Sequence, residues 1–385
     1  MQDPTRKKPA TGKGNGLANI HNQYKSTYFE AQTKQDLNPT FQPLQSPETF
    51  LNINPYEGQT GTPQANGESN YFTVRTANAW IEQAKTKPIP QMLFGEFWFE
   101  GELCILFADT NLGKSILGVQ IGDSISKGER IPGFKFEAEK QRIIYFDFEL
   151  SEKQFANRYS IQYEKNYEFS NFFWRAEINP EAAIPEGFES FEKYLNHSLE
   201  SAIIETGAKV LIIDNLTYLK NATETAKDAL PLMKHLKALK SKYGLSILAL
   251  AHTPKRDLSK PITRNDLQGS KMLINFCDSS FSIGESTIDK NIRYLKQIKA
   301  RNTEIIFDAD NVCICQIDKP SNFLQFEFVN FGTEREHLRQ ITEKDKNGLD
   351  EKVIELKKQG RSLREIGVEV GISHMKVKRI LDECK

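Results

Sequence analysis

One short polar segment carries the strongest structural signal in this chain: Phe107-Ala-Asp-Thr-Asn-Leu-Gly-Lys-Ser115. It follows the apolar run Leu103 to Phe107, which is typical of a buried strand, and leads into a helical pattern from Lys114 to Lys127. The segment matches the phosphate-binding pattern G-x-x-x-x-G-K-[ST] at every fixed position except the first, where Ala108 replaces glycine. Because strand, loop and helix follow in the required order, a chance match is the weaker interpretation.

The residue types in this loop suit the binding of a nucleotide phosphate. Backbone N–H groups wrap the β-phosphate, and the following helix presents the positive end of its dipole. Lys114 reaches the β- and γ-phosphates, while Ser115 offers a hydroxyl to Mg²⁺. Asn111 stands where many such loops have glycine, and asparagine tolerates a left-handed φ. We therefore predict an ATP and Mg²⁺ site with nucleotide contacts from Ala108, Asp109, Thr110, Asn111, Leu112, Gly113, Lys114, Ser115 and Ile116.

Apolar runs alternate with helical patterns through the middle of the chain. Strands are expected at 103–107, 142–148, 210–214 and 245–251, and weaker ones at 280–283, 292–299 and 312–317. Helices are expected at 77–85, 114–127, 151–163, 188–206 and 226–243. This alternation predicts an α/β fold with a mainly parallel sheet covered on both faces, and the later runs predict an antiparallel extension at one edge.

The run Val210 to Asp214 ends in a carboxylate. We expect its strand to lie beside the strand of the phosphate loop, where Asp214 would hold a water of the Mg²⁺ shell together with Ser115. The alternative is a polar residue that merely ends a strand, and the neighbouring phosphate loop makes that alternative weaker.

Composition divides the 385-residue chain into four parts. Residues 1–75 are polar and poor in periodic apolar residues, which predicts a disordered arm. Residues 76–332 form the α/β domain, the charged stretch 333–348 is expected to be a linker, and 349–385 form a small helical domain. The formal net charge is +0, so any contact with DNA must come from local patches.

The five cysteines lack paired C-x-x-C spacing, which favours buried reduced thiols over a zinc site or disulfides. No stretch approaches the roughly 18 apolar residues of a membrane helix, and no signal-peptide core is present. We expect a soluble, cytoplasmic protein without a membrane partner.

The sequence from about 89 to 331 resembles the RecA-like P-loop ATPases, and within them the RepA-type hexameric helicases and the AAA-labelled ATPases of mobile elements. Five segments carry the resemblance: Gly101-Glu-Leu103, Tyr145-Phe-Asp-Phe-Glu-Leu-Ser151, Leu211-Ile-Ile-Asp-Asn-Leu216, Leu250-Ala-His-Thr-Pro-Lys255 and Lys296-Gln-Ile-Lys-Ala-Arg-Asn302. It implies a RecA-like fold and hydrolysis of ATP between the subunits of a ring.

The resemblance also assigns roles to particular residues. Glu149 would orient the attacking water from a strand next to the phosphate strand, and Asp147 would share its strand face. The choice of Glu149 over Asp147 rests on the resemblance. His252 would sense the γ-phosphate from the adjacent strand end, although a lone histidine is more often structural.

Lys299 and Arg301 match the lysine and the arginine finger that this family inserts into a neighbour's site. Their spacing places both on one strand face. An arginine supplied by another subunit accelerates hydrolysis by roughly 10³ to 10⁵. If Arg301 acts so, the active unit is a homo-oligomer, most naturally a hexamer; the equal alternative is a solvated charge pair on an edge strand.

The loop after His252, residues 253–269, is expected to face the channel of such a ring. Its four basic residues would track a single-stranded DNA backbone: Lys255, Arg256, Lys260 and Arg264. Aromatic residues for base stacking are missing from this loop, so the contacts would be mainly to phosphates. An exposed loop with ordinary lysines is a real competitor.

Residues 349–385 predict short helices at 351–357, 362–370 and 374–384, with a glycine-containing turn between the last two. Ser362 and Glu365 form a capping box, and Ser373 is a cap for the last helix. The pattern resembles the helix-turn-helix of resolvase-type and regulator domains. In that geometry the last helix enters the major groove of duplex DNA, with contacts from Ser373, His374, Met375, Lys376 and Lys378, and with Arg379 nearer phosphate. The alternative is a small oligomerisation or partner-binding domain.

The leading hypothesis is an ATP-dependent DNA-processing motor or loader, similar to RepA-type replicative helicases of plasmids and mobile elements. A second hypothesis is an ATP-switched DNA-binding regulator that separates no strands. A third is an interaction scaffold whose nucleotide site has decayed; Ala108 hints at it, and the intact Lys114, Ser115 and Asp214 speak against it.

Overall fold

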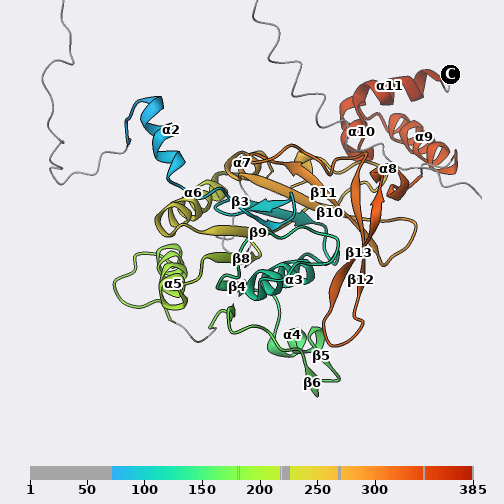
Figure 1. The fold of residues 1–385 in the computed structure, drawn as a ribbon. Coiled ribbons are helices and arrows are strands. Elements are labelled where there is room, and N and C mark those ends of the chain that lie inside the picture. The colour runs from blue at the N-terminus through green and yellow to red at the C-terminus, as the bar shows by residue number, and fades with distance from the viewer. Residues whose placement is uncertain are drawn as a thin grey trace, which may run out of the picture. The chain divides into compact units, whose positions relative to one another are not determined.

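The computed structural model describes residues 72–179, 181, 183–216, 218, 226–267, 270–340 and 343–383 (Figure 1). The chain divides into two units after Thr76, and every helix and strand described below belongs to the second unit. The arm expected over residues 1–75 lies outside the described residues up to position 71.

A nine-stranded sheet forms the centre of the domain, in the order β13-β12-β11-β10-β3-β9-β8-β4-β7. The six strands from β10 to β7 are parallel to their neighbours, and β11, β12 and β13 continue the sheet antiparallel from β10. The predicted mainly parallel sheet with an antiparallel extension at one edge is therefore confirmed. The bounds are β3 Leu103–Ala108, β4 Ile143–Asp147, β7 Phe173–Ala176, β8 Val210–Asp214, β9 Ser246–His252, β10 Ser279–Glu285, β11 Ile292–Lys299, β12 Val312–Asp318 and β13 Gln325–Gly332.

The order of the strands corrects two expectations. β9 pairs with both β3 and β8, so the strand that ends in Asp214 does not lie beside β3. β4, which precedes Glu149, lies beyond β8. The run of β9 is buried from Ser246 to Ala251, which suits a central strand with neighbours on both edges. His252, at the end of β9, does lie next to the end of β3 as predicted.

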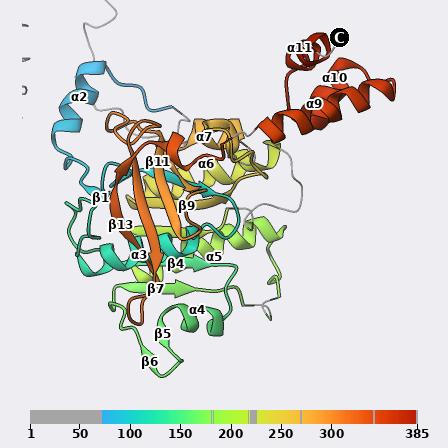
Figure 2. The same cartoon turned by 90° about the vertical axis from the view of Figure 1, so that its right-hand side faces the viewer.

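Helices cover both faces of the sheet (Figure 1). Alternate residues of β3 face opposite sides: Cys104 and Leu106 join the core beneath α3 (Lys114–Lys127), while Leu103 and Ile105 join a second core. That second core contains side chains from α5 (Phe191–Thr206), α6 (Ala226–Tyr243) and α7 (Ser270–Phe276). The sheet is thus the middle layer of three, as Figure 2 also shows.

The helix expected over 151–163 is shorter than predicted. α4 spans Glu152–Arg158, and the chain then forms a small hairpin of β5 (Ser160–Ile161) and β6 (Lys165–Asn166). Gln162 and Tyr163 have φ of 52° and 63°, which a right-handed helix excludes. A second small hairpin precedes the main sheet and consists of β1 (Met92–Phe94) and β2 (Trp98–Phe99), while α2 spans Ala77–Lys85 as predicted.

The stretch expected to be a linker, 333–348, is structured at both ends. α8 spans Glu334–His337, and the first and last residues of this helix are both buried. Glu334 pairs with Lys296 of β11, and Ser286 Oγ lies 2.8 Å from His337 Nδ1. The high charge of this stretch predicted a linker, but Glu334 and His337 form polar contacts with buried residues of the α/β domain.

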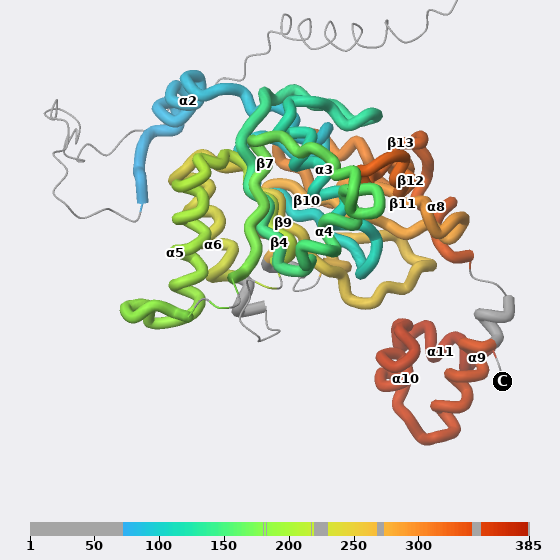
Figure 3. The backbone as a smooth tube through the Cα atoms, turned by 90° about the horizontal axis from the view of Figure 1, so that it is seen from below, coloured from blue at the N-terminus to red at the C-terminus, as the bar shows by residue number. Residues whose placement is uncertain are grey.

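Three helices at the C-terminal end form a module with its own small core: α9 (Glu343–Lys358), α10 (Leu363–Val370) and α11 (His374–Glu383) (Figure 3). The core consists of Val353, Leu356, Ile366, Val377 and Ile380. The capping box of Ser362 and Glu365 is present, and the Ser373 hydroxyl accepts a hydrogen bond from the Lys376 N–H at 3.3 Å. Gly371 ends α10 with φ 70°, a conformation that favours glycine.

Four cysteines are buried free thiols, as predicted: Cys104, Cys277, Cys313 and Cys315. Cys384 lies outside the described residues. Among the residues that the structure describes, no helix has the length and apolar character needed to cross a membrane.

We expect Ile366→Ala to unfold the three-helix module. Ile366 is fully buried, and truncation of a buried isoleucine costs about 2–5 kcal/mol. A core of this size supplies only about 3–5 kcal/mol in total. Limited proteolysis should therefore cleave the variant within 343–383 while the α/β domain stays resistant. Val368→Ala on the same helix is the matched control, because Val368 is 85% exposed; equal resistance of both variants would contradict the separate core.

Candidate active site

The loop after β3 adopts the backbone that the sequence predicted. Asn111 has φ 63° and Gly113 has φ 92°. A Cβ atom at Gly113 would also lie 2.8 Å from Ile317 Cδ1 and 2.9 Å from Phe326 Cε2. Glycine is therefore required here both by the left-handed backbone and by the packing of the loop against β12 and β13.

Lys114, the first residue of α3, is buried and points back along its own loop. Its Nζ donates to the carbonyl oxygens of Ala108 at 3.1 Å and Asp109 at 3.0 Å, and it lies 3.1 Å from His252 Nδ1. Burial lowers the pKa of Lys114, and the nearby carboxylates of Asp214 and Glu149 oppose that shift. The ammonium is held beside the loop by neutral acceptors, which an anionic phosphate oxygen can replace with a gain in electrostatic energy.

Asp214, at the end of β8, is a buried carboxylate. Burial raises its pKa to about 6, although the hydroxyls of Ser115 and Tyr145 oppose the shift. Tyr145 donates to Asp214 Oδ2 at 2.6 Å, whereas the buried Oδ1 accepts no hydrogen bond from the described residues. An oxygen of this kind beside a serine hydroxyl fits a hard divalent cation or a water of its shell. Ser115 and Asp214 therefore fit Mg²⁺.

Glu149, His252 and Asn215 meet beside Lys114. Asn215 Nδ2 donates to Glu149 Oε1, and His252 Nε2 lies 3.3 Å from the same oxygen. The hydrogen bond from His252 lowers the pKa of Glu149, and burial opposes this. The Glu149 side chain stays 40% exposed, so an ionised carboxylate that is fixed by two donors still reaches solvent.

His252 lies between the lysine and the glutamate. Its Nδ1 is 3.1 Å from Lys114 Nζ, and its Nε2 is 3.3 Å from Glu149 Oε1 and 3.1 Å from Asn215 Nδ2. His252 thus connects the phosphate-loop lysine with the Glu149 carboxylate and the Asn215 amide that contacts it.

Asp147 is occupied elsewhere. Its carboxylate accepts from the backbone N–H groups of Glu149 at 3.2 Å and Leu150 at 2.9 Å, and it pairs with Arg175 at 2.9 Å. The side chain is fully buried. β4 ends at Asp147, so Glu149 lies beyond the strand, and the expectation that both carboxylates share a strand face is wrong.

Sequence reasoning missed the roles of Asn215 and Tyr145. Both fall in segments that carried the family resemblance, but a strand tyrosine and an asparagine after an aspartate have no distinctive pattern. Asn215 reaches Glu149 because β4 and β8 are neighbours with Asp147 level with Asp214. That register, which the sequence does not display, was the missing information.

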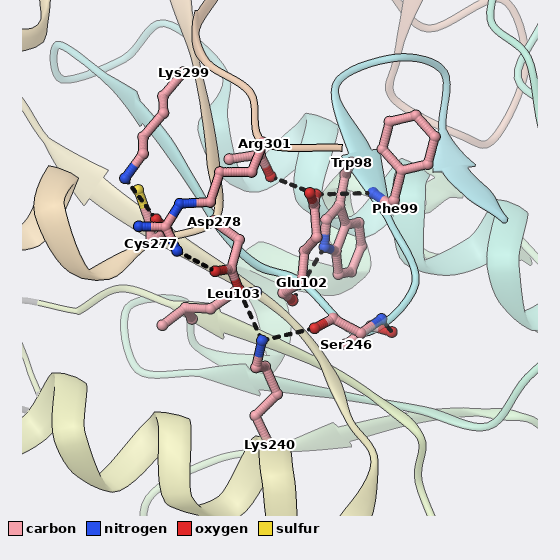
Figure 4. Close-up of polar contacts among 12 residues, drawn as sticks. Trp98, Phe99, Glu102, Leu103, Lys240, Ser246, Cys277, Asp278, Lys299 and Arg301 are labelled. Atoms are coloured by element: carbon pink, nitrogen blue, oxygen red, sulfur yellow. Dashed lines mark hydrogen bonds and ion pairs between the residues drawn. The ribbon is translucent and has the colours of Figure 1, made fainter. Parts of the chain in front are cut away.

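Lys299 and Arg301 do not join this site. They lie at the opposite, amino-terminal edge of the sheet, beside the start of β3 (Figure 4). Lys299 Nζ donates to the carbonyls of Ile274 at 2.6 Å and Cys277 at 2.7 Å, and Arg301 NH1 lies 3.0 Å from Asp278 Oδ1. Arg301 follows the end of β11, so the two residues do not share a strand face.

The basic residues of the loop 253–267 differ from one another in exposure. Lys255, Lys260 and Arg264 are exposed. The Arg256 side chain is 8% exposed, pairs with Asp266 at 3.3 Å and donates to the Lys260 carbonyl at 2.8 Å. Arg256 therefore stabilises the loop from inside, and its burial does not favour the contact with DNA that the sequence predicted. A charge count along the loop could not separate this buried arginine from its exposed neighbours.

The residues expected to contact duplex DNA lie on the outer face of α11 and at its start. Val377 and Ile380 of the same helix are buried. The residues expected to contact DNA are all exposed: Ser373, His374, Met375, Lys376, Lys378 and Arg379. No acidic residue occurs in the first turn of α11. The outer face at the start of α11 is thus mostly polar and locally basic.

Residues 72–257 match a family model described as AAA domain, which is just under half of the 385-residue chain. The match includes Lys114, Glu149, Asp214 and His252 and ends before β10. No curated protein matches the chain. The match supports an AAA-type, P-loop ATPase-like domain, in agreement with the α/β sheet and the loop geometry.

We expect Asp214→Asn to stabilise the protein at neutral and higher pH. The native pKa of about 6 lies above the ordinary 3.8, so the native state binds a proton more tightly than the unfolded state. The ionised carboxylate thus destabilises the native state by up to about 3 kcal/mol above pH 6, and this penalty fades as the pH falls toward 4.

Urea denaturation with a chelator at pH 8, 6 and 4.5 tests this expectation. The gain in the free energy of unfolding should be largest at pH 8 and small at pH 4.5. Glu304→Gln, which removes an exposed carboxylate, should show no such trend. A pH-independent gain, or a loss at pH 8, would contradict the desolvation of Asp214.

Proposed function

We propose that this protein is a RecA-like, Mg²⁺-dependent ATPase that acts on DNA, as a replicative helicase or loader similar to the RepA type. One observation carries the catalytic part: Lys114, His252, Glu149 and Asp214 converge at the carboxyl ends of four neighbouring strands. This cluster holds a phosphate-binding lysine, a carboxylate for a cation and a separate ionised carboxylate for water.

In the proposed reaction each residue has a distinct task. Glu149 accepts a hydrogen bond from the attacking water and orients it toward the γ-phosphate. Asn215 and His252 fix the Glu149 carboxylate and hold it ionised through their hydrogen bonds. Lys114 exchanges the carbonyls of Ala108 and Asp109 for phosphate oxygens.

Ser115 and Asp214 would hold Mg²⁺, which would neutralise charge on the phosphates. The unpartnered Oδ1 of Asp214 supports this role, because a buried carboxylate oxygen without a donor is unfavourable until a cation or its water approaches. Tyr145 keeps the other oxygen of the carboxylate in place.

Arg301 would act in the site of a neighbouring subunit. The start of β3 lies near Arg301, because Asp278 contacts both Leu103 and Arg301. The loop of Lys114 follows the other end of this six-residue strand, roughly 17 Å away. The residue is therefore outside the reach of its own site, which supports action in trans and a homo-oligomer, most naturally a hexameric ring.

DNA contact is proposed at two places. Lys255, Lys260 and Arg264 offer exposed charge for the phosphates of a single strand. The polar face of α11 offers His374, Lys376 and Lys378 to duplex DNA in the manner of a recognition helix.

Steady-state ATP hydrolysis tests the proposal. We expect Lys114→Ala to abolish turnover, and Glu149→Gln to lower kcat about 100-fold or more while nucleotide binding persists. Arg301→Ala should lower kcat by about 1000-fold or more. Single-stranded DNA should stimulate the wild type.

Mixing separates action in trans from a local defect. Arg301→Ala and Glu149→Gln subunits should regain activity together, because one supplies an intact site and the other an intact arginine. Full turnover by Lys114→Ala protein would rule out the assignment of the site.

A second candidate is an ATP-switched DNA-binding regulator, which the separate core of α9, α10 and α11 favours. Slow hydrolysis that is indifferent to single strands, together with tight duplex binding, would select it over the motor.

We expect the double substitution Lys376→Ala and Lys378→Ala to weaken duplex binding about 10- to 100-fold and to reduce the salt slope by about one per lost phosphate contact. Fluorescence anisotropy with duplex DNA at several salt concentrations measures both quantities. Lys352→Ala removes an exposed lysine from α9 of the same module and is the matched control. Unchanged affinity of the double variant would remove α11 from the proposed duplex contact.

A further inference from the structure

Asp278 is the centre of a polar cluster at the amino-terminal edge of the sheet (Figure 4). Its Oδ2 accepts from the backbone N–H of Leu103 at 3.0 Å and from Lys240 Nζ at 2.8 Å. Its own N–H donates to the Leu103 carbonyl at 2.8 Å. Main chain and side chain are both anchored, so this carboxylate is a fixed point between α7 and β10.

Arg301 is the less constrained member of the cluster. It lies beyond the last residue of β11, so no ladder of the sheet holds its backbone. NH1 donates to Asp278 Oδ1 at 3.0 Å, and NH2 donates to the Asn275 carbonyl at 3.5 Å. The Arg301 side chain is 49% exposed and that of Asp278 is 16% exposed. A partly buried, fixed carboxylate thus orients a solvent-facing guanidinium.

The guanidinium retains capacity for a further acceptor. Arginine has five N–H donors in a planar fork, and the contacts with Asp278 and the Asn275 carbonyl fix the plane of the Arg301 fork. Arg301 and Asp278 also line a cavity of about 690 Å³, together with the basic residues Lys87, Lys209 and Lys240. The edge therefore offers both an oriented cation and space beside it for a group from another molecule.

We propose that Asp278 is a positioning residue for the ATPase reaction, because it holds Arg301 in the orientation that the site of a neighbouring copy uses. This inference rests on the proposed function, in which Arg301 acts in trans. Leu103, which Asp278 binds, begins the strand whose other end carries the loop of Lys114. Asp278 thus contacts two elements of one subunit: Arg301, which acts in the neighbouring subunit, and β3, which leads to the phosphate loop of the same subunit.

Asp278→Asn tests this role with little change of shape, since its amide oxygen still accepts from the Leu103 N–H. The amide nitrogen then faces Arg301 NH1, so both the hydrogen bond and the charge of that contact are lost. Small misplacement of a reacting group lowers rates by about 10- to 100-fold. We expect kcat to fall by that factor and the KM for ATP to stay unchanged. Asp278→Glu, which keeps the charge, should recover part of the loss. Lys242→Gln, at an exposed lysine of α6 that pairs with Glu200 and not with Asp278, should retain full activity.

Mixing experiments distinguish positioning from a general structural role. Asp278→Asn protein mixed with Glu149→Gln protein should regain activity, since the second supplies a well-placed arginine to the intact site of the first. Asp278→Asn mixed with Arg301→Ala should not, because both lack a working arginine. Wild-type kcat for Asp278→Asn, or a loss that Glu149→Gln protein does not rescue, overturns the proposal.

The reference mixture of Arg301→Ala with Glu149→Gln keeps the two hypotheses apart. If that mixture regains activity while Asp278→Asn behaves as wild type, the positioning role fails and the proposed action of Arg301 in trans stands. If Arg301→Ala itself has normal turnover, the role of Arg301 in the proposed function fails and the inference about Asp278 fails with it.

Discussion

The parallel pairing of β3 with its two neighbours is the constraint on which the site depends. β3 lies between β10 and β9 and is buried along its whole length. The loop that follows β3 therefore begins at the edge of the sheet where the parallel strands end. Parallel strands deliver their carboxyl ends to the same edge of a sheet. Lys114, His252, Asp214 and Glu149 therefore meet although they are far apart in the sequence.

Burial gives these groups their chemical character. Lys114 and Asp214 are both desolvated, which lowers the pKa of the amine and raises that of the acid. Neither forms an ion pair within the described residues: Lys114 is held by carbonyls and Asp214 by hydroxyls. Two opposite charges that are buried near one another without pairing lower the stability of the folded protein. An anionic ligand and a cation would recover the loss, so the cost in stability is itself an argument for a binding site.

The sequence was sufficient wherever a local pattern determines structure. The loop backbone at Asn111 and the capping box at Ser362 follow from local preferences, and both are present. Strand order was not predictable, because the insertion of β9 between β3 and β8 depends on long-range pairing that leaves no local pattern. The contrast between Arg256, buried against Asp266, and the exposed lysines around it likewise arises from tertiary packing. Four residues predicted for the site, Lys114, Glu149, Asp214 and His252, do lie together, whereas Lys299 and Arg301 do not, and these spatial relations required the register of the sheet.

The two edges of the sheet at which the parallel strands begin and end carry different groups of the proposed site. The carboxyl edge holds the phosphate loop, while the amino edge holds Arg301 on its Asp278 support. The rigid, fully buried β3 lies between them, so one copy cannot bring both to a single phosphate group. If Arg301 serves a phosphate site, that site belongs to another copy, whose own arginine must serve a third. Contacts between unlike surfaces of identical subunits are head-to-tail, and they close into a ring when the rotation per subunit allows it.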